Sequence, residues 1–578
     1  MVVIDGGDGH DILDYSYLHG DVSVDFNDGS IVSIERYIGS TGKDTVFASV
    51  GSFNYLETDG LASIDGNDGI DNLSYLWFGE SIVVTTGNPD NDSLDIVEAL
   101  DQSGDTNWRT TFYNFEEVRS GSDDKERLSG TKGDDIIFGK GGDDTLSGGK
   151  GNDTLEGGKG ADKLNGGAGI DTIDYLTSSS SVWINMEGGN GFFGDASGDT
   201  FSMIENVSGS GLSDSISGDT GDNYILGHGG DDQFIINTNA GQDTFDGGRG
   251  SDTIDFYDNV DYGGITINLT TGINGGGATG LTLIDVENVE GGRLAGNHIL
   301  TGNFQHNRLY GGNANDQLFG MAGDDSLFGG IGNDIINGGG GNDLLYGDAG
   351  NDTIIGNDDD DTIYGGDGND TIYGDDGNDY IDGGSGNDTI YGGSGDDQII
   401  GGFGIDVMDG GIGNDTVDVS HAGGPVGGGI IDLSSGTINW DKGQVDTAIN
   451  FENIIGSQGD DTLIGSSGNN ALNGGAGNDR LIGGDGYDWL TGGSGADIIE
   501  LNFGDGHDRM YDFEDGIDII DLSSTGLSFA DLNLRDTDIG VEIGYEFIGN
   551  GPKVTAIGDL ELEGILASQI SEADFLFA

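Results

Sequence analysis

The 578-residue sequence contains no cysteine, only 3 prolines and few basic residues. The lack of cysteine excludes disulfides and thiolate metal sites as the groups that hold this fold together. Lysine and arginine number 19 against 105 aspartates and glutamates, which gives a formal net charge of -86. Such an acidic surface repels nucleic acid phosphates and anionic lipid head groups, so the composition argues against direct binding to either.

Long apolar runs are also missing. No run of 18 or more apolar residues occurs, so we expect no membrane-spanning helix. The first residues, MVVIDGGDGHD, lack the basic and apolar regions of a secretion signal, so we expect no cleaved N-terminal signal peptide. The H-E-x-x-H motif of zinc proteases and the G-x-S-x-G motif of lipases are absent as well, which argues against those two catalytic sites.

Glycine is abundant instead, at 117 residues, and much of it stands in nine-residue units such as GGDGNDTIY, GDDGNDYID and GGSGNDTIY over residues 365–391. An aspartate recurs every nine residues without a gap at Asp316, Asp325, Asp334, Asp343, Asp352, Asp361, Asp370, Asp379, Asp388, Asp397, Asp406 and Asp415. An apolar residue stands two positions after each aspartate, from Leu318 to Val417. A plain acidic linker would not keep an apolar residue in register, so the pattern indicates an ordered repeat.

The parts of the unit G-G-x-G-x-D-x-U-x, where U is apolar, have separate physical roles. Glycine tolerates left-handed backbone angles, so G-G-x-G permits a tight turn with its carbonyls pointing inward. The remaining x-U-x is long enough for one short strand with U facing the core. If two units complete one coil, residues 18 apart stack, with Asp352, Asp370 and Asp388 along one edge and Asp361, Asp379 and Asp397 along the other.

Stacked carboxylates would repel one another strongly unless a divalent cation lay between successive turns. Calcium prefers oxygen ligands, and it is the bridging group that remains in a chain without cysteine. Without such counter-ions we expect much of this polyanionic chain to be expanded.

The nonapeptide resembles the RTX, or hemolysin-type calcium-binding, repeat. The resemblance implies an all-β fold, a right-handed parallel β-roll or β-helix solenoid, with calcium ions held between stacked turns by aspartate carboxylates and loop carbonyls. Besides the twelve central aspartates, the implied calcium ligands are Asp135, Asp144, Asp153, Asp162 and Asp171 in a first roll, Asp461, Asp479, Asp488 and Asp497 in a third, and Asp232, Asp243 and Asp252 in shorter copies. Asp11 and Asp71 stand in imperfect copies.

A longer composite unit is laid over the nonapeptides in about five copies. Each copy has D-x-x-D-Y or a variant, then alternating apolar residues, then an E-N anchor or a variant of it, as in DTIDYL (171–176) with IENVSGS (204–210). The alternation predicts longer irregular β-coils between the rolls. After most of these anchors the next repeat carries asparagine instead of aspartate, at Asn54, Asn223, Asn307 and Asn470, and we expect no full calcium site there.

These patterns divide the chain into seven predicted segments. They are two divergent RTX-like β modules (1–130), a first β-roll (131–175), two linking β modules with short RTX copies (176–315), the central long β-roll (316–418), a linking β module (419–458), a third β-roll (459–500), and a C-terminal capping and secretion module (501–578).

Two further features bear on function. Phe328, Tyr346 and Tyr364 form an outward aromatic column, with Tyr373 and Tyr391 on the alternate face, and cross-strand packing explains such a column more often than ligand binding. The segment FGDGHDRMYDFEDGIDIIDLSS (503–524) resembles the C-terminal module of type I secreted RTX proteins, including serralysin-like proteases, and the ending DFLFA resembles their uncleaved secretion signal.

The sequence therefore predicts a secreted calcium-binding protein that leaves a Gram-negative bacterium through a type I secretion channel and folds on extracellular calcium. We expect a non-enzymatic surface-layer, matrix or adhesion scaffold, because no segment free of the repeat pattern is large enough for a catalytic domain. Two alternatives stay open: the C-terminal part of a secreted protease, lipase or alginate epimerase whose catalytic domain lies upstream, and calcium-dependent binding of a polysaccharide.

Overall fold

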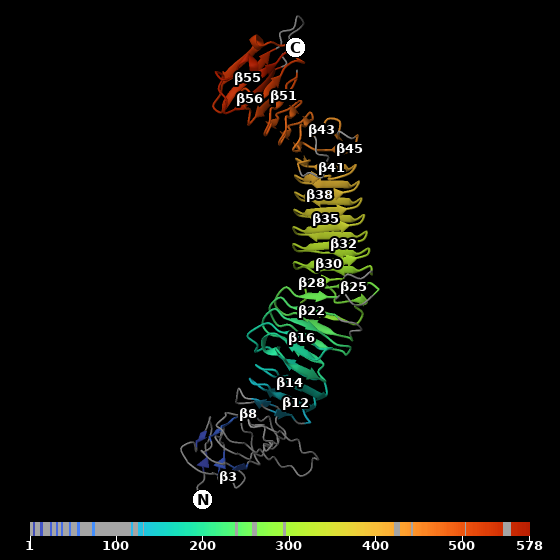
Figure 1. Ribbon diagram of the computed structural model, residues 1–578, viewed down its shortest axis with the longest axis vertical. Coiled ribbons are helices and arrows are strands. Elements are labelled where there is room, and N and C mark those ends of the chain that lie inside the picture. The colour runs from blue at the N-terminus through green and yellow to red at the C-terminus, as the bar shows by residue number, and fades with distance from the viewer. Residues whose placement is uncertain are drawn as a thin grey trace. The chain divides into compact units, whose positions relative to one another are not determined.

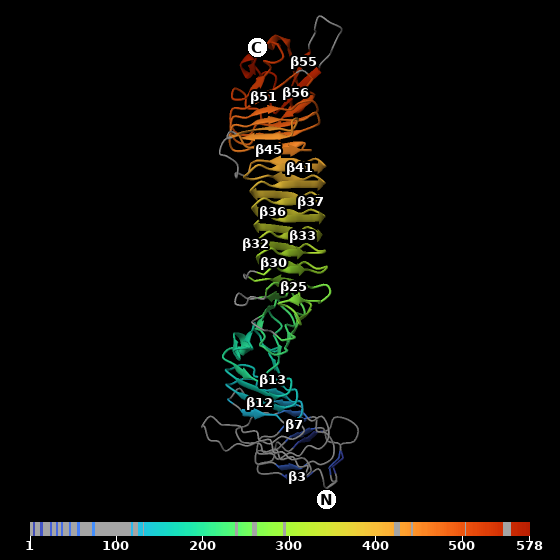
Figure 2. The ribbon, with the colours of Figure 1, turned by 90° about the vertical axis from the view of Figure 1, so that its right-hand side faces the viewer.

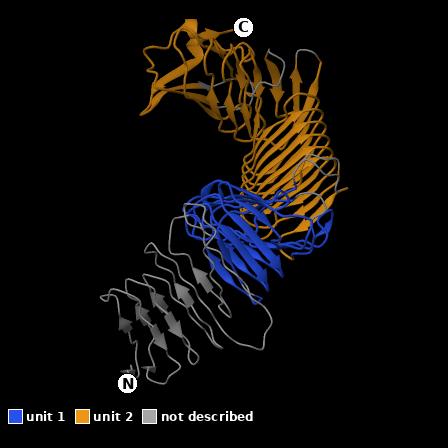
Figure 3. Ribbon diagram, turned by 60° about the horizontal axis from the view of Figure 1, so that its bottom comes forward, with its two compact units in different colours: residues 1–260, 272–288 blue, residues 261–271, 289–578 orange. Residues whose placement is uncertain are grey.

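The computed structural model describes residues 125, 127–130, 132–236, 241–256, 263–292, 296–420, 428–440, 443–502, 504–546 and 557–578, together with nine short strands between residues 4 and 119. The chain divides into two compact units (Figure 3). Unit 1 comprises Met1–Val260 and Gly272–Asn288, and unit 2 comprises Asp261–Thr271 and Val289–Ala578. The predictions for Asp11, Asn54 and Asp71 lie outside the described side chains.

Unit 1 is built almost entirely from short parallel strands that form two ladders. One ladder contains β10 (Arg127–Ser129), β12 (Thr145–Lys150), β14 (Lys163–Ala168), β16 (Trp183–Asn185), β17 (Asn190–Phe192), β18 (Thr200–Ser202), β20 (Ser215–Ser217), β22 (Gln233–Ile235) and β24 (Thr253–Asp255). The other contains β8 (Asn72–Ser74), β9 (Glu117–Arg119), β11 (Ile136–Phe138), β13 (Thr154–Glu156), β15 (Thr172–Asp174), β19 (Asn206–Ser208), β21 (Tyr224–Leu226), β23 (Thr244–Asp246) and β27 (Thr282–Ile284).

The remaining elements of this half of the chain are small. Three separate groups pair β1 (Ile4–Asp5) with β4 (Ile31–Val32), β2 (Ile12–Asp14) with β5 (Arg36–Ile38) and β7 (Tyr55–Glu57), and β3 (Ser23–Asp25) with β6 (Thr45–Phe47). A two-residue strand, β26 (Gly275–Gly276), and a 3-10 helix, η2 (Gly194–Ala196), lie in linking segments, and β28 (Asn288–Glu290) spans the boundary residues of the two units.

Unit 2 repeats this arrangement in longer ladders (Figures 1 and 2). The first contains β30 (Arg308–Asn313), β32 (Ser326–Ile331), β34 (Leu344–Ala349), β36 (Thr362–Asp367), β38 (Tyr380–Ser385), β40 (Gln398–Ile400), β42 (Thr416–Asp418), β46 (Asn453–Ile455), β48 (Ala471–Asn473), β50 (Trp489–Thr491), β52 (His507–Met510), β54 (Leu532–Asp536), β55 (Gly540–Glu546) and β56 (Ile557–Glu563).

The second ladder of unit 2 contains β25 (Ile265–Asn268), β29 (Ile299–Thr301), β31 (Gln317–Phe319), β33 (Ile335–Gly340), β35 (Thr353–Asp358), β37 (Thr371–Asp376), β39 (Thr389–Ser394), β41 (Val407–Ile412), β43 (Gly429–Asp432), β44 (Thr437–Trp440), β45 (Val445–Ile449), β47 (Thr462–Ile464), β49 (Arg480–Ile482), β51 (Ile498–Glu500), β53 (Ile519–Asp521) and β57 (Phe575–Leu576). Two 3-10 helices, η3 (Phe529–Asp531) and η4 (Glu572–Asp574), complete the unit.

Each strand pairs in parallel with the strand two nonapeptides away in the sequence, as the repeat predicts. Ile363 on β36 pairs with Leu345 on β34, and Ile354 on β35 pairs with Ile336 on β33, each 18 residues apart. Successive nonapeptides therefore alternate between the two ladders, and two of them complete one coil. This confirms the predicted all-β parallel β-roll.

The apolar residue of each nonapeptide lies in the core between the two ladders. Across the central roll these side chains are at most 1% exposed, from Leu318 through Ile363 to Val417. The same position is fully buried at Leu155 in unit 1 and at Leu481 near the C-terminal end. A thin roll has one core residue per strand, so each of these side chains supplies a large share of the apolar burial of its coil.

Glycine is required where turns of neighbouring coils approach each other. Gly368 has a φ of +144°, and a Cβ there would lie 1.3 Å from the carbonyl oxygen of Gly350, one coil earlier. No side chain fits in that space, so the turns stack only because this position is glycine.

Antiparallel strands interrupt the coils at a few places. In unit 1, β16 and β17 pair in antiparallel fashion between two nonapeptide runs. In unit 2, β43, β44 and β45 do the same, and β54, β55 and β56 form an antiparallel sheet that joins β52. Among the described residues, no helix has the length and apolar character needed to cross a membrane.

Candidate metal centres

All twenty-four aspartates predicted as calcium ligands are buried, with at most 2% of any of them exposed. Each aspartate stands directly before a strand and two positions before a buried core residue, so its backbone lies close to the core. Burial of an aspartate is costly unless its carboxylate finds partners, because a desolvated charge is unfavourable. The partners of the two carboxylate oxygens therefore define the chemistry of these positions.

The first carboxylate oxygen binds the preceding coil. The backbone N–H of Asp352 donates to Oδ1 of Asp370 at 2.8 Å, and the N–H of Asp370 donates to Oδ1 of Asp388 at 2.8 Å, each 18 residues along the chain. Asp361, Asp379 and Asp397 form an equivalent series on the other ladder. The aspartates thus make two separate columns.

The second oxygen, Oδ2, has no hydrogen-bond partner in most of these residues. Within the described residues this holds for Asp153, Asp162, Asp171, Asp232, Asp243, Asp252, the twelve central aspartates from Asp316 to Asp415, Asp479 and Asp488. An unpaired buried polar atom costs about 1–3 kcal/mol, and more when it is charged. So many equivalent unpaired oxygens indicate a cationic partner that is not part of the polypeptide.

A cradle formed with a backbone carbonyl oxygen lies beside many of the unpaired Oδ2 atoms. A Cβ added to Gly365 would lie 2.8 Å from Oδ2 of Asp370 and 2.5 Å from the carbonyl oxygen of Gly383 in the next coil. At Gly374 the corresponding distances are 2.2 Å to Oδ2 of Asp379 and 2.4 Å to the carbonyl oxygen of Gly392. Carboxylate and carbonyl oxygens are the ligands that calcium takes in proteins, so these residues fit the ion.

Backbone carbonyls are essential to these sites. In the part of the chain that the structure describes, no group of three acidic or histidine side chains is placed to hold a metal ion together. An ion in a cradle would therefore take most of its ligands from stacked turns.

Burial and mutual repulsion raise the pKa of the carboxyl groups. Burial is the larger cause, and it raises the pKa of Asp361 to about 8 and those of Asp352 and Asp388 to about 7. The negative charges of aspartates one coil away raise these pKa values further. Without a cation, ionisation of these carboxyl groups is thus less favourable than in water.

Some positions replace the cation with a donor from the protein itself. Ser457 donates its N–H at 2.6 Å and its O–H at 2.9 Å to Oδ2 of Asp461, one of the predicted ligands. The Tyr175 hydroxyl donates to Asp199 at 2.9 Å, and Trp440 Nε1 donates to Asp446 at 2.7 Å. Asp461 is therefore less available to an ion than the other predicted ligands.

The asparagines after the E-N pairs follow the same logic. Nδ2 of Asn223 donates to the carbonyl oxygen of Glu205 at 2.9 Å, and Nδ2 of Asn470 donates to that of Glu452 at 2.6 Å. An amide N–H is placed where a regular repeat has a bare carboxylate oxygen. The contact favours the prediction that Asn223 and Asn470 mark coils without a full calcium site.

A second ladder of hydrogen bonds, made by asparagine side chains, was not predicted from the sequence. The residue before each repeat aspartate is often asparagine, and its side chain accepts the N–H of the residue one coil later, as in Asn351 to Asn333 at 2.8 Å and Asn369 to Asn351 at 2.7 Å. This direction is opposite to that of the aspartates, so every coil is bound to both neighbours. The recurring G-N-D triplet was the available signal.

The aromatic columns are packed against themselves. Tyr346 and Tyr364 have ring centroids 4.8 Å apart at an interplanar angle of 12°, and Phe328 and Tyr346 are 5.1 Å apart at 7°. Tyr373 and Tyr391 stack in the same way at 5.1 Å and 8°. Each ring covers a face of its neighbour, which favours packing over sugar binding for these columns.

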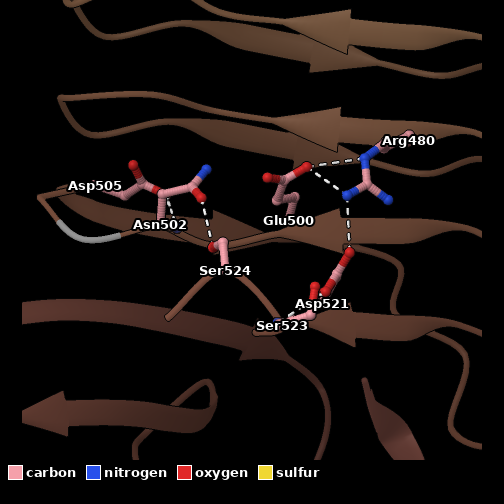
Figure 4. Close-up of polar contacts among 7 residues, drawn as sticks. All are labelled: Arg480, Glu500, Asn502, Asp505, Asp521, Ser523 and Ser524. Atoms are coloured by element: carbon pink, nitrogen blue, oxygen red, sulfur yellow. Dashed lines mark hydrogen bonds and ion pairs between the residues drawn. The ribbon is translucent and has the colours of Figure 1, made fainter. Parts of the chain in front are cut away.

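Ion pairs join coils from the third roll into the C-terminal module. Arg480 on β49 donates to Glu500 on β51 at 2.9 Å and to Asp521 on β53 at 2.8 Å (Figure 4). Arg480 thereby links three neighbouring strands of one ladder. Its positive charge joins acidic groups of successive coils, as a cation between turns would. On the other ladder, a cavity of about 270 Å³ at β50, β52, β55 and β56 has five acidic residues among its nine lining residues, and its Arg509 is paired with Glu561 at 2.9 Å.

The chain end closes the last coil. β57 pairs in parallel with β53, and the ring of Phe575 lies 5.6 Å from the rings of Phe529 and Phe577. Asp574 accepts the N–H of Ser571 at 2.7 Å as part of the cap of η4. In the folded protein the residues resembling a secretion signal are therefore structural.

Parts of the chain are similar to known proteins. No curated protein matches the chain. Solved structures that resemble part of it include the extracellular lipase LipA from Serratia marcescens, with 19% identity over 40% of each chain and a TM-score of 0.16. Another is the AlgE6R3 subunit of the Azotobacter vinelandii mannuronan C5-epimerase, with 20% identity over 39% of this chain and 81% of that one and a TM-score of 0.10. The chain thus spans less than half the length of the lipase.

The family model for the RTX calcium-binding nonapeptide repeat (4 copies) matches ten segments: residues 120–155, 138–173, 208–235, 235–254, 295–327, 319–354, 355–390, 391–419, 450–481 and 473–508. These segments contain all of the predicted calcium ligands, and repeats of this family bind calcium. These segments, which make up nearly half of the chain, are therefore RTX calcium-binding repeats.

Proposed function

We propose that this protein is secreted unfolded, folds when it binds extracellular calcium, and then acts as a non-enzymatic scaffold in a surface layer, matrix or adhesive contact. The observation that carries the proposal is the repeated cradle, in which a buried, unpaired aspartate oxygen lies beside a glycine carbonyl of the next coil. Calcium at these positions joins coil to coil along both ladders, and the resulting folded stack is the functional object.

Calcium concentration would control folding through the charge of the chain. The formal net charge is -86, and columns of carboxylates are buried. Repulsion among these negative charges destabilises the folded roll when calcium is absent. Ion binding and folding are then coupled, because the cradles exist only when coils stack. Low calcium inside a cell keeps the chain unfolded and suited to a type I channel, and calcium outside the cell folds it.

The described part of the chain supports a scaffold. It consists of stacked coils and short linking strands, and its outward aromatic rings cover one another instead of lining a binding face. Stacked turns joined by ions resist bending and proteolysis better than loops do, which suits a structural role outside the cell.

A calcium titration of the purified, chelated full chain tests the folding step. Far-UV circular dichroism should show a cooperative gain of β-structure as calcium rises, and native mass spectrometry should show many ions bound per chain. A chain that is already folded in chelator, or that stays disordered in millimolar calcium, would contradict the proposal.

Export is tested with the chain end. Removal of residues 574–578 should leave the protein inside the producing cells, whereas the complete chain appears in the medium or on the surface. The shortened protein, purified and titrated with calcium, is the control for folding. Normal export of the shortened chain would exclude a role of this end as the secretion signal.

A further inference from the structure

The E-N pairs belong to a four-residue segment that recurs where a run of nonapeptides is interrupted. The segments are MIEN (203–206), DVEN (285–288) and NFEN (450–453), each with a buried apolar residue in second place. They follow the last aspartates of three runs, Asp171, Asp252 and Asp415, after an insertion of more than one coil.

The glutamate of each segment occupies the place of a repeat aspartate. The N–H of Asp171 donates to Oε2 of Glu205 at 2.9 Å, 34 residues later. The N–H of Asp252 donates to Glu287 and the N–H of Asp415 donates to Glu452, also at 2.9 Å, over 35 and 37 residues. In an uninterrupted run the aspartate 18 residues later accepts this N–H, so the glutamate restores the register after the insertion.

The first residue of each segment completes the cradle. A Cβ on Gly166 would lie 2.1 Å from the carbonyl oxygen of Met203 and 2.6 Å from Oδ2 of Asp171. On Gly247 the distances are 2.3 Å to the carbonyl oxygen of Asp285 and 2.3 Å to Oδ2 of Asp252. The third copy, at Gly410, has the carbonyl oxygen of Asn450 at 2.4 Å and Oδ2 of Asp415 at 2.8 Å.

These carbonyls are held at an energetic cost. Met203, Asp285 and Asn450 have φ values of 54°, 47° and 58°, in the left-handed region that is unfavourable for most residues with a Cβ. In the regular repeat a glycine such as Gly383 occupies the carbonyl position, without a left-handed φ. Three different side chains kept in this conformation indicate that the direction of the carbonyl matters more than the residue that provides it.

Glutamate instead of aspartate follows from the length of the turn. In the regular repeat the carbonyl residue precedes the aspartate by five positions, as Gly365 precedes Asp370, whereas Met203 precedes Glu205 by two. The acidic residue keeps its register, because Glu205 stands directly before β19 as Asp370 stands directly before β37, but its turn is three residues shorter. The additional methylene of glutamate lets its carboxylate reach back to the N–H of the preceding coil.

We propose that these three segments are calcium clamps, in which one ion joins the last aspartate of a run to the left-handed carbonyl and the glutamate supplies the second acidic group. Asp171, Asp252 and Asp415 each have an unpaired Oδ2 and are fully buried, so the clamp has a bare ligand aimed into it. Each clamp closes an inserted segment onto the roll, and the inference rests on the calcium-dependent folding proposed above.

The substitution E205Q tests the first clamp in the full chain. Glutamine keeps the length and an acceptor for the Asp171 N–H but removes the charge. We expect the calcium concentration that half-protects the amides of residues 171–174 and 203–208 from hydrogen exchange to rise by about tenfold. The amides of residues 316–418 should keep their calcium midpoint, which shows that the rest of the chain folds.

The matched control is E187Q, which removes an exposed glutamate from the same inserted segment and should change no midpoint. E287Q and E452Q should shift only the amides of their own segments. Unchanged midpoints in all three glutamine variants of a chain that folds with calcium would overturn the clamp and leave the proposed function intact. Amides protected equally in chelator and in calcium would overturn both.

Discussion

At the scale of single residues, the partner of one oxygen decides whether a coil needs an ion. Asp370 uses Oδ1 to accept an N–H of the preceding coil and leaves Oδ2 without a partner. At Asn470 a side-chain N–H donates to a carbonyl of the preceding coil instead. We therefore expect a junction with aspartate at this position to need an ion and a junction with asparagine to form without one.

Replacing the aspartate by asparagine should convert an ion-dependent junction between two coils into one that forms without an ion. In D370N the new amide can still accept the Asp352 N–H and can donate to the glycine carbonyl, so the roll should fold with fewer ions. The lost site should lower stability in saturating calcium by about 2 kcal/mol, since an ion at 100 times its Kd contributes about 2.7 kcal/mol.

Native mass spectrometry and local hydrogen exchange measure both effects for D370N. The control is D367N, which removes an exposed charge from the same turn and should change neither. An unchanged ion count in D370N would show that Asp370 is not a ligand.

Proton binding should partly replace calcium. The pKa of Asp361 is raised from 3.8 to about 8 by burial first and by neighbouring aspartates second, and the pKa of Asp352 is raised to about 7. Between these values and 3.8 the folded chain holds protons that the unfolded chain releases, so lower pH stabilises the calcium-free fold and higher pH destabilises it.

Circular dichroism of chelated protein should therefore show β-structure increasing as the pH falls from about 8 to about 5. The calcium-loaded protein should respond in the opposite sense, because protons compete with the ion for the same oxygens. A chelated chain whose β-signal is flat or falls over this range would contradict the raised pKa values.

At the scale of the structural element, the coil could be predicted from the sequence because the nine-residue period is strict. One apolar residue in nine fixes the core, and one aspartate in nine fixes the two columns, so ladders, register and buried carboxylates follow from spacing alone. The asparagine ladder and the roles of Glu205 and Glu452 were not predicted. They depend on which side chain reaches an N–H 18 or more residues away, and the insertions break the period that carried the other predictions.

The turn glycines differ in what they permit, although the sequence shows them alike. G368A places a methyl group where the Gly350 carbonyl lies, so we expect a loss of more than about 3 kcal/mol and local opening of two coils. G340A meets nothing closer than 3.9 Å and has no left-handed φ, so it should be tolerated.

Denaturant unfolding in saturating calcium, followed by hydrogen exchange, distinguishes the two glycine variants. Because repeat arrays unfold coil by coil, the exchange of neighbouring amides is the more informative signal. Equal stability of G368A and G340A would mean that adjacent turns are not stacked as closely as described.

At the scale of the whole molecule, the charge that opposes folding also selects what can promote it. The carboxylates that need a partner are buried, and the ions that screen surface charge act in bulk water at distances of about 10 Å in 0.1 M salt. Sodium can reduce repulsion between exposed acidic residues, but it cannot supply two charges to oxygens fixed between turns.

Magnesium has the charge but a different coordination. It demands near-octahedral geometry and releases its waters reluctantly, whereas calcium accepts more ligands and irregular geometry. The cradle offers a carboxylate oxygen and backbone carbonyls whose positions are set by strand pairing, so it cannot contract around a smaller ion. We therefore expect millimolar calcium to fold the chelated protein, and neither equal magnesium nor about 0.5 M sodium chloride to do so. Circular dichroism under the three conditions measures this, and full folding in magnesium or in salt alone would show that screening of the net charge, and not bridging of paired coils, holds the molecule together.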